Sequence, residues 1–378
     1  MAVQARRAKP PKKSTSTANV RYCNLPPRPA PVLPPGIDLG RARAIIVGRS
    51  MWVNGTVLHY YFFDRDTDGS TVRFSDGTTQ FVSWVGPAAQ QDAVRSAFEE
   101  WKALGIGLEF REVDDRSEAE VRIGFQSRYD GSWSYLGRDV LDQPMNARTM
   151  NFGWDLTTEY GRSTALHEIG HTLGMPHEHQ NPFTGIVWDE QAVYGYFGGE
   201  PNNWDRETTY HNVLRKLSNS EVEGSSWDPD SIMEYWFPEG LILEPAQYRV
   251  GLTPAGTLSE RDSEYVRRWY PGIEDPELRT LKPFESLPLS LQPGEQVDVT
   301  LEPPGTRDYS IGTFGASDVV LVLFEEIGGE LRYVAGDDDS GEDRNALIEA
   351  KLFQGRRYVA RLRMYYATES GQTALMYW

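Results

Sequence analysis

The stretch HEIGHTLGMPHEHQNP, residues 167–182, contains four of the six histidines in this chain of 378 residues. His167 and His171 are four positions apart, so a helix brings them to one face, where two imidazoles can bind the same ion. Glu168 can reach the open side of that ion, and a turn containing glycine lets His177 supply a third ligand. Three protein ligands leave one position for water, which is the arrangement of a catalytic zinc rather than a structural one.

This spacing predicts a hydrolase with one catalytic Zn²⁺ held by His167, His171 and His177. Zinc lowers the pKa of a bound water toward ~7. Glu168 beside that water can take its proton and later pass it to a leaving amine, as a general base and then an acid. The alternative is a chance H-E-x-x-H with ordinary surface histidines, but the longer H-E-x-x-H-x-x-G-x-x-H spacing disfavours it.

The composition limits the class of protein. Hydrophobic residues make up 39% and aromatic residues 12%, which predicts sizeable cores and excludes wholesale disorder. The net charge of −17 argues against a nucleic-acid partner. No apolar run approaches the ~20 residues of a membrane span. Cys23 is the only cysteine, so the chain cannot form an intramolecular disulfide.

The amino-terminal part is basic and rich in proline, serine and threonine. We interpret residues 1–45 as a flexible tail or a propeptide-like leader. This segment contains no apolar core of the kind found in signal peptides. Export would then use another route or a signal that has been removed, and an intracellular protein is the remaining alternative.

The rest of the chain predicts an α+β domain followed by an all-β domain. Residues 46–272 form the first domain, 273–281 a proline-rich linker, and 282–378 a sandwich of strands separated by Gly, Pro and Asp turns. Within the first domain, apolar periodicity predicts strands at 51–64 and 148–156 and helices at 90–104, 164–175 and 258–270.

At residues 167–177 the chain resembles the metzincin zinc proteases. Glu178, directly after the third histidine, is similar to the residue found there in the astacin family. The stretch SIMEY, residues 231–235, resembles the Met-turn of that family. The resemblance implies that Met233 forms an apolar floor beneath the zinc. It also implies that Tyr235 is a further zinc ligand that swings away to hydrogen-bond the oxyanion. Ordinary core packing is the alternative role for both residues.

Looser similarity covers residues 52–270 and implies a twisted sheet, a long helix above an active-site helix, and a cleft between two subdomains. RTMNFGW, residues 148–154, resembles the strand at the edge of the cleft that pairs with an extended peptide substrate. In the family, the counterpart of Glu178 binds the amino terminus freed by propeptide removal, a role that the long leader argues against here. Serralysin-like membership is the nearest rival, and the resemblance implies secretion.

The predicted function is therefore a zinc metalloendopeptidase acting on protein or peptide substrates. Residues 282–378 resemble the prepeptidase C-terminal domain of secreted bacterial peptidases, which implies an accessory role. The alternative is a catalytically silent zinc-binding protein that uses its sandwich for adhesion. An intact Glu168 argues against this alternative. The sequence leaves the oligomeric state open.

Three weaker signals each have two interpretations. Cys23 could cap the zinc, as the inhibitory cysteine of matrixin propeptides does, or it could be structural or incidental. His179 could support the metal ligands through a hydrogen bond, although we favour a solvent-facing position in a loop. The acidic stretches at 64–69 and 336–343 could bind Ca²⁺ or form ordinary turns.

Overall fold

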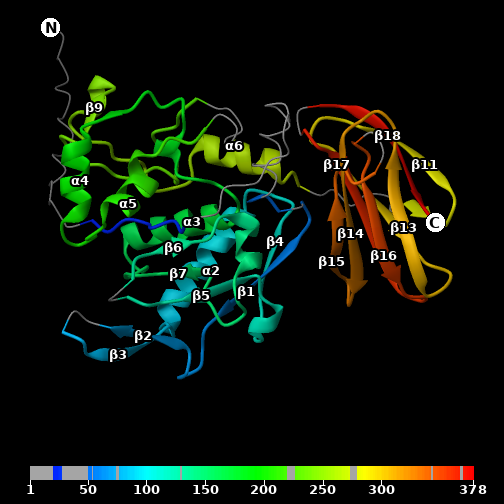
Figure 1. Cartoon of the computed structure of the whole chain (residues 1–378), viewed down its shortest axis with the longest axis horizontal. Helices are drawn as coiled ribbons and strands as arrows, with labels where there is room; N and C mark the ends of the chain where they lie inside the picture. The colour runs from blue at the N-terminus through cyan, green and yellow to red at the C-terminus, as the bar shows by residue number, and fades with distance from the viewer. Residues whose placement is uncertain are drawn as a thin grey trace, which may run out of the picture.

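The computed structural model describes residues 20–27, 50–52, 54–73, 76–127, 130–218, 226–272, 279–341, 344–366 and 369–378. These residues form an α+β domain and, beside it, a domain built from strands alone (Figure 1). The predicted fold class is thereby confirmed. Within these ranges, no helix is both long enough and apolar enough to cross a lipid bilayer.

A five-stranded sheet forms the centre of the first domain, in the order β4-β1-β5-β7-β6. Its strands are β1 (Val57–Phe62), β4 (Glu109–Glu112), β5 (Val121–Gly124), β6 (Trp133–Ser134) and β7 (Met150–Asn151). All neighbours are parallel except β6, which runs antiparallel to β7 and lies at the edge. The prediction that residues 148–154 form the edge strand is wrong, because β7 pairs on both sides and β6 takes the edge.

Two helices pack on this sheet and on each other. Helix α2 (Ala88–Lys102) buries Val94, Phe98 and Trp101 at helical spacing. Helix α3 (Glu159–Thr172) begins at Thr158, whose side chain accepts a hydrogen bond from the main chain of the first turn. The indole of Trp101 donates to a main-chain carbonyl of α3 at 3.1 Å and joins the two helices. The helices predicted at 90–104 and 164–175 are confirmed.

The remaining elements of this domain surround the sheet and α3 (Figure 1). Strands β2 and β3 form a hairpin, β8 and β9 form a second pair, and α6 starts with a capping box. Their bounds are β2 (Gly69–Arg73), β3 (Thr79–Ser83), β8 (Val187–Trp188), β9 (Ile242–Glu244), α4 (Glu190–Gly198), α5 (Arg206–Thr209), the π-helix η4 (Tyr210–Leu214) and α6 (Glu260–Trp269). The short 3₁₀ helices are η1 (Arg116–Glu118), η2 (Gly137–Asp142), η3 (Glu178–Gln180) and η5 (Ala246–Tyr248).

The two largest apolar cores of the first domain are separate from each other. The larger core joins the sheet with α2 and α3. The smaller core is formed by α4, β9 and the segments around Tyr235 and Phe237. The carboxyl-terminal end of α3 leads into the loop that connects the two cores. The division into two subdomains stays a prediction.

The second domain is a sandwich of two sheets, in the orders β10-β12-β17-β14-β15 and β11-β18-β13-β16. Its strands are β10 (Arg279–Leu281), β11 (Ser286–Leu291), β12 (Gln296–Leu301), β13 (Arg307–Phe314), β14 (Val319–Ile327), β15 (Glu330–Asp337), β16 (Leu347–Leu352), β17 (Arg357–Met364) and β18 (Gly371–Tyr377). Residues 279–281 of the predicted linker thus belong to the sandwich, where β10 pairs with β12. Residues 273–278 lie outside the described ranges.

Charged side chains join the two domains. The guanidinium of Arg361 on β17 binds both carboxylate oxygens of Asp298 at 2.7 Å and also donates to the main-chain carbonyl of Asn54 in the first domain. Glu330 at the start of β15 pairs with Arg111 on β4. These contacts place the sandwich at the end of the five-stranded sheet where β1 and β4 lie, at the opposite end of the sheet from β6.

Candidate metal centre and its surroundings

Helix α3 carries the first two predicted metal ligands into the interior. His167 and His171 are one turn apart and buried, and their ring centroids are 4.7 Å apart. Gly174 follows the helix with a φ of 96°, a conformation that glycine adopts without the penalty that other residues pay. The chain then turns back, and the ring of His177 comes to 4.7 Å from that of His171.

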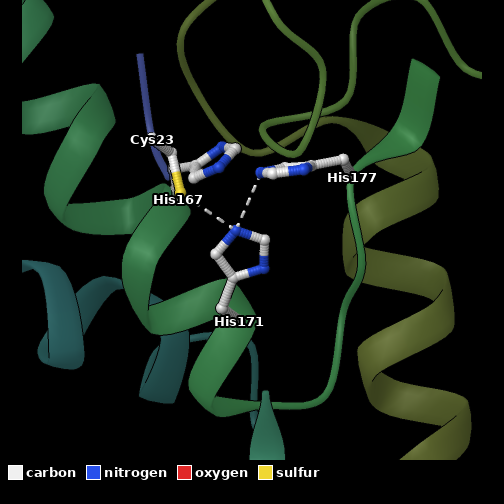
Figure 2. A group of neighbouring side chains, drawn as sticks. All are labelled: Cys23, His167, His171 and His177. Carbon is white, nitrogen blue, oxygen red and sulfur yellow. Dashed lines mark hydrogen bonds between the residues drawn. The ribbon is translucent and has the colours of Figure 1, made fainter. Parts of the chain in front are cut away.

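The three imidazoles converge with a fourth group, the thiol of Cys23 (Figure 2). One ligand atom from each of these four residues lies within 4.8 Å of all the others. All four side chains are buried. The structure therefore brings together the three histidines that the sequence singled out and adds a cysteine from a distant segment.

A hydrogen bond from Nδ1 fixes the tautomer of each of the two histidines on α3. Nδ1 of His167 lies 2.8 Å from the carbonyl of Ile232, and Nδ1 of His171 lies 2.7 Å from the carbonyl of Met175. A carbonyl only accepts, so both Nδ1 atoms donate and both Nε2 atoms carry a lone pair. This is the form in which histidine binds a metal.

The environment keeps these rings neutral. Burial lowers the pKa of His167 to about 4 and lowers the pKa values of His171 and His177 well below the ordinary range. Nε2 of His167 has no hydrogen-bond partner, and Nε2 of His171 faces Nε2 of His177 at 3.2 Å. Three buried imidazoles whose nitrogens converge in this way fit a cation among them, and imidazole nitrogens suit zinc.

Glu168 lies on α3 between the two helical ligands and is fully buried. Its Oε2 accepts from the thiol of Cys23 at 3.4 Å, while Oε1 has no partner. Burial raises the pKa of Glu168 well above its usual value, and the hydrogen bond from Cys23 opposes this shift. A carboxyl with a free oxygen beside the ligand cluster has the position that a general base needs.

Cys23 reaches the cluster from the leader segment, which we define as residues 20–27. Its Sγ lies 3.4 Å from Nε2 of His171, and dashed lines mark this contact in Figure 2. Burial, and then the charge of Glu168, raise the pKa of the thiol well above its ordinary value. The thiol therefore occupies the side of the histidine cluster on which Glu168 lies.

The leader segment is ordered, contrary to the prediction of a flexible tail over this part of residues 1–45. It lies across the first domain next to α3 (Figure 1). The amide of Asn24 donates to the carbonyl of Ser132, beside β6, at 3.0 Å. The guanidinium of Arg21 donates to the carbonyl of Gly153 at 3.2 Å. These two contacts hold the segment in place. Residues 1–19 and 28–49 lie outside the described ranges.

The segment 231–235 passes beneath the cluster. Met233 is buried and packs against Gly170 of α3, where a Cβ atom would overlap the methionine sulfur. Asp262 on α6 holds this segment, because its carboxylate accepts from the Ser231 hydroxyl at 2.6 Å and from the Ile232 amide at 2.7 Å. The apolar floor expected from Met233 agrees with this position.

Tyr235 lies beside the histidine cluster. Its ring centroid is 4.6 Å from that of His177 and 6.0 Å from that of His167. Its hydroxyl donates to the main-chain carbonyl of Cys23 at 2.5 Å. Burial raises the pKa of Tyr235 well above its ordinary value, so the phenol stays protonated and able to donate.

Glu178 links the third ligand to the segment below. Its amide donates to the carbonyl of Met233 at 3.0 Å. Its Oε1 accepts from the Asn181 side chain at 3.2 Å and from the Asp228 amide at 2.9 Å. Burial raises the pKa of Glu178 to about 8. The carboxyl is thus engaged by groups within the domain.

His179 is buried, so the prediction of a solvent-facing loop position is wrong. Its Nε2 lies 2.8 Å from the carbonyl of Asn212, and its ring stacks on His177 at a centroid distance of 5.3 Å. The ring also lies 4.5 Å from that of Tyr235. His179 therefore packs directly behind one predicted ligand and the predicted oxyanion donor.

The two acidic stretches considered for calcium form ordinary polar contacts. In residues 64–69, Asp68 is buried and pairs with Arg116 at 3.2 Å. In residues 336–343, three neighbouring aspartates come close together, and Asp337 accepts from a nearby serine hydroxyl at 2.5 Å. Nothing in the described residues supports calcium at either place.

The sequence did not single out two residues of this site, Asp262 and Tyr22, and the position predicted for a third, His179, was wrong. Asp262 lies in the first turn of α6, where the sequence pattern indicates only a helix cap. His179 was underestimated because a histidine in a loop carries no sign of its burial. Tyr22 lies next to Cys23 in a segment whose composition is typical of a flexible tail.

A cleft opens beside the cluster, with a volume of about 630 Å³. His167, Glu168 and Tyr235 line it from the domain, while Tyr22 and Cys23 of the leader segment form part of its wall. A chain entering this cleft meets the unpartnered oxygen of Glu168 and the phenol of Tyr235. The arrangement suits hydrolysis of a bound carbonyl compound.

Known proteins match this region. The profile of the matrixin family matches residues 69–183. "Metalloendoproteinase 1-MMP" of Arabidopsis thaliana is 29% identical over 147 residues, which are 33% of this chain and 39% of that protein. "Hatching enzyme" of Paracentrotus lividus is 34% identical over 100 residues, which are 23% of this chain and 16% of that protein. The chain thus spans well under half of these two relatives.

A solved structure is also similar to much of this chain. Myroilysin is 30% identical, with a TM-score of 0.50, over 61% of this chain and 99% of its own.

Proposed function

Because this chain belongs to the metzincin superfamily of zinc metalloproteases and carries a C-terminal β domain, we propose that it is a zinc-dependent endopeptidase. The substrate is an extended peptide segment of a protein, bound in the cleft beside α3. The observation that carries this proposal is the convergence of three buried, neutral imidazoles next to the unpartnered carboxyl oxygen of Glu168.

In this proposal His167, His171 and His177 hold one zinc ion. When bound, zinc supplies a Lewis acid that polarises the scissile carbonyl and lowers the pKa of a coordinated water. Glu168 takes a proton from the attacking water as the new carbon–oxygen bond forms. It returns that proton to the amide nitrogen as the carbon–nitrogen bond breaks, so that the leaving amine departs neutral.

Tyr235 stabilises the negative charge that develops on the former carbonyl oxygen. Burial keeps its phenol protonated, and in the structure this hydroxyl donates to the carbonyl of Cys23, a main-chain oxygen lying in the cleft. A substrate carbonyl in the same place would receive the same hydrogen bond. A donor aimed at developing charge in a buried site contributes more than it would in water. His179 packs against the Tyr235 ring and restricts its orientation.

Replacing Tyr235 with phenylalanine tests this role. The ring and its packing remain, and only the donor is lost, so we expect kcat to fall about a hundred-fold with little change in KM. Steady-state kinetics on a quenched fluorescent peptide measure both constants. An unchanged kcat would leave only the alternative, in which Tyr235 is a core residue.

The proposed activity as a whole is tested with casein, with and without a zinc chelator. We expect one zinc per chain by elemental analysis, cleavage that stops after chelation, and recovery when Zn²⁺ is added back. Stoichiometric zinc without cleavage, after the leader has been released, would favour the alternative of a catalytically silent binding protein.

We further propose astacin-like membership within the superfamily and export from the cell. Glu178 after the third histidine and Tyr235 in the Met-turn support the first, although the matched family profile is that of the matrixins. Mass spectrometry of the protein recovered from culture medium would test the second and reveal whether the leader is cut.

A further inference from the structure

Tyr22 of the leader segment is enclosed by aromatic side chains of the first domain. Its ring centroid lies 4.8 Å from that of Phe197 and 5.2 Å from that of Tyr235. The rings of Tyr196, Trp204 and Phe237 lie between 6.2 and 6.5 Å away. Only 3% of Tyr22 is exposed. We call these five side chains the aromatic pocket.

Hydrogen bonds hold Tyr22 at two atoms and the nearby Val20 at a third. The Tyr22 hydroxyl lies 3.2 Å from the hydroxyl of Tyr196. Its main-chain amide donates to Oδ1 of Asn202 at 3.1 Å, and Nδ2 of Asn202 donates to the carbonyl of Val20 at 3.1 Å. An asparagine that binds the main chain on both sides of a residue holds an extended chain of any sequence. The aromatic pocket alone then distinguishes one side chain from another.

The aromatic pocket adjoins the reaction site. Tyr235 belongs to both, and Tyr22 and Cys23 are consecutive residues that line the cleft together with Glu168. A peptide that places its scissile carbonyl near Tyr235 therefore brings a neighbouring side chain to the place that Tyr22 holds. Once the leader segment leaves, the pocket rings lose an apolar partner, which favours a new aromatic occupant.

Resting on the proposed function, we propose that the aromatic pocket is a specificity pocket for an aromatic residue, tyrosine above all, next to the cleaved bond. In the full chain, Tyr22 of the leader segment occupies the aromatic pocket and so competes with the substrate side chain. The hydroxyl of Tyr196 selects tyrosine over phenylalanine, and the five rings select aromatic over small or acidic side chains.

The first test measures release of the leader segment without measuring proteolysis. In the full chain, the buried thiol of Cys23 is expected to react slowly with iodoacetamide. Tyr22→Ala removes the ring, so we expect alkylation to accelerate about ten-fold or more, whereas Tyr22→Phe changes it only a few-fold. Zinc content and the melting temperature establish that each variant is folded. Equal alkylation rates in wild type and Tyr22→Ala overturn the role of Tyr22 as an anchor.

The second test measures binding to the emptied pocket. The full chain carrying both Tyr22→Ala and Cys23→Ser is titrated with a fluorescent peptide copying residues 20–27, with serine in place of cysteine. We expect the peptide with tyrosine at its third position to bind about ten-fold tighter than the one with alanine. Tyr196→Phe should abolish the preference for tyrosine over phenylalanine. Tyr194→Phe is the control and should retain this preference, because Tyr194 lies on another face of α4, beneath Arg206. Equal affinities for tyrosine and alanine overturn the proposal.

Cleavage-site mapping on denatured casein completes the test with the same full-length variant. Enrichment of aromatic residues at one fixed position beside the cut supports the pocket as a substrate site. Cuts without that enrichment overturn this part of the inference while leaving endopeptidase activity intact. Absence of any cut contradicts the proposed function, and the alkylation and peptide-binding results still decide whether the pocket binds an aromatic residue.

Discussion

Glu168→Ala will bind zinc as the wild type does and will lose peptide cleavage by about a thousand-fold or more. The three imidazoles remain, because their positions depend on α3, on the turn at Gly174 and on carbonyls that Glu168 does not contact. The group that moves the proton disappears, and general acid–base catalysis is worth about 10²- to 10⁴-fold. Elemental analysis measures the zinc, and kcat/KM on a quenched peptide measures cleavage.

Glu159→Ala is the matched control for this variant. Glu159 lies in the first turn of the same helix and is exposed, so its loss should leave kcat/KM within about two-fold. Glu168→Gln keeps the shape of the side chain and should be as inactive as Glu168→Ala. Retained turnover in Glu168→Gln would refute the assignment of the general base.

Cys23→Ser will raise the initial rate of peptide cleavage by the full chain about a hundred-fold. The thiol lies within 3.4 Å of both His171 and Glu168, so it fills the side of the cluster where a substrate must approach. A serine hydroxyl is a much weaker zinc ligand than a thiolate, so it holds the leader segment less firmly. If Cys23 contributes about 3 kcal/mol to holding the leader segment, its loss raises the fraction of molecules with an open cleft about a hundred-fold.

The rate is taken before any processing, with mass spectrometry to verify that the leader is still attached. Pro27→Ser is the control, since Pro27 belongs to the same segment but is exposed and should leave the rate at the wild-type level. If Cys23→Ser and wild type cleave equally slowly with zinc fully bound, Cys23 is a structural or incidental cysteine and does not cap the zinc.

Local spacing made the core of the candidate site predictable. His167 and His171 are one helical turn apart, and Gly174 marks the turn that returns His177, so a single stretch of sequence determines their approach. Met233 and Tyr235 were accessible only through family resemblance, because some sixty residues separate them from the cluster. The α+β domain and the sandwich followed from the change in apolar periodicity near residue 280.

The remaining features depend on contacts that no local pattern encodes. Cys23 meets Glu168 across 145 positions of sequence, and its segment has the composition of a flexible tail. Family resemblance predicted residues 148–154 as the edge strand, and the pairing of the two-residue strand β6 beyond β7 is a long-range contact that no local pattern indicates. The burial of His179 depends on rings from Tyr235 and Phe237, which approach from another part of the chain.

The position of the leader segment beside β6 has a consequence for the behaviour of the molecule in solution. An open sheet edge offers unpaired amides and carbonyls to any extended chain, including a second copy of the same protein. At the other end of the sheet, Glu330 of the sandwich binds Arg111 on β4 and keeps a neighbouring domain against that edge. The leader segment does the same for the β6 end through Asn24. Departure of the leader therefore exposes the β6 edge of the sheet at the same time as it opens the cleft to substrates. Self-association and substrate binding would then use the same hydrogen-bonding groups.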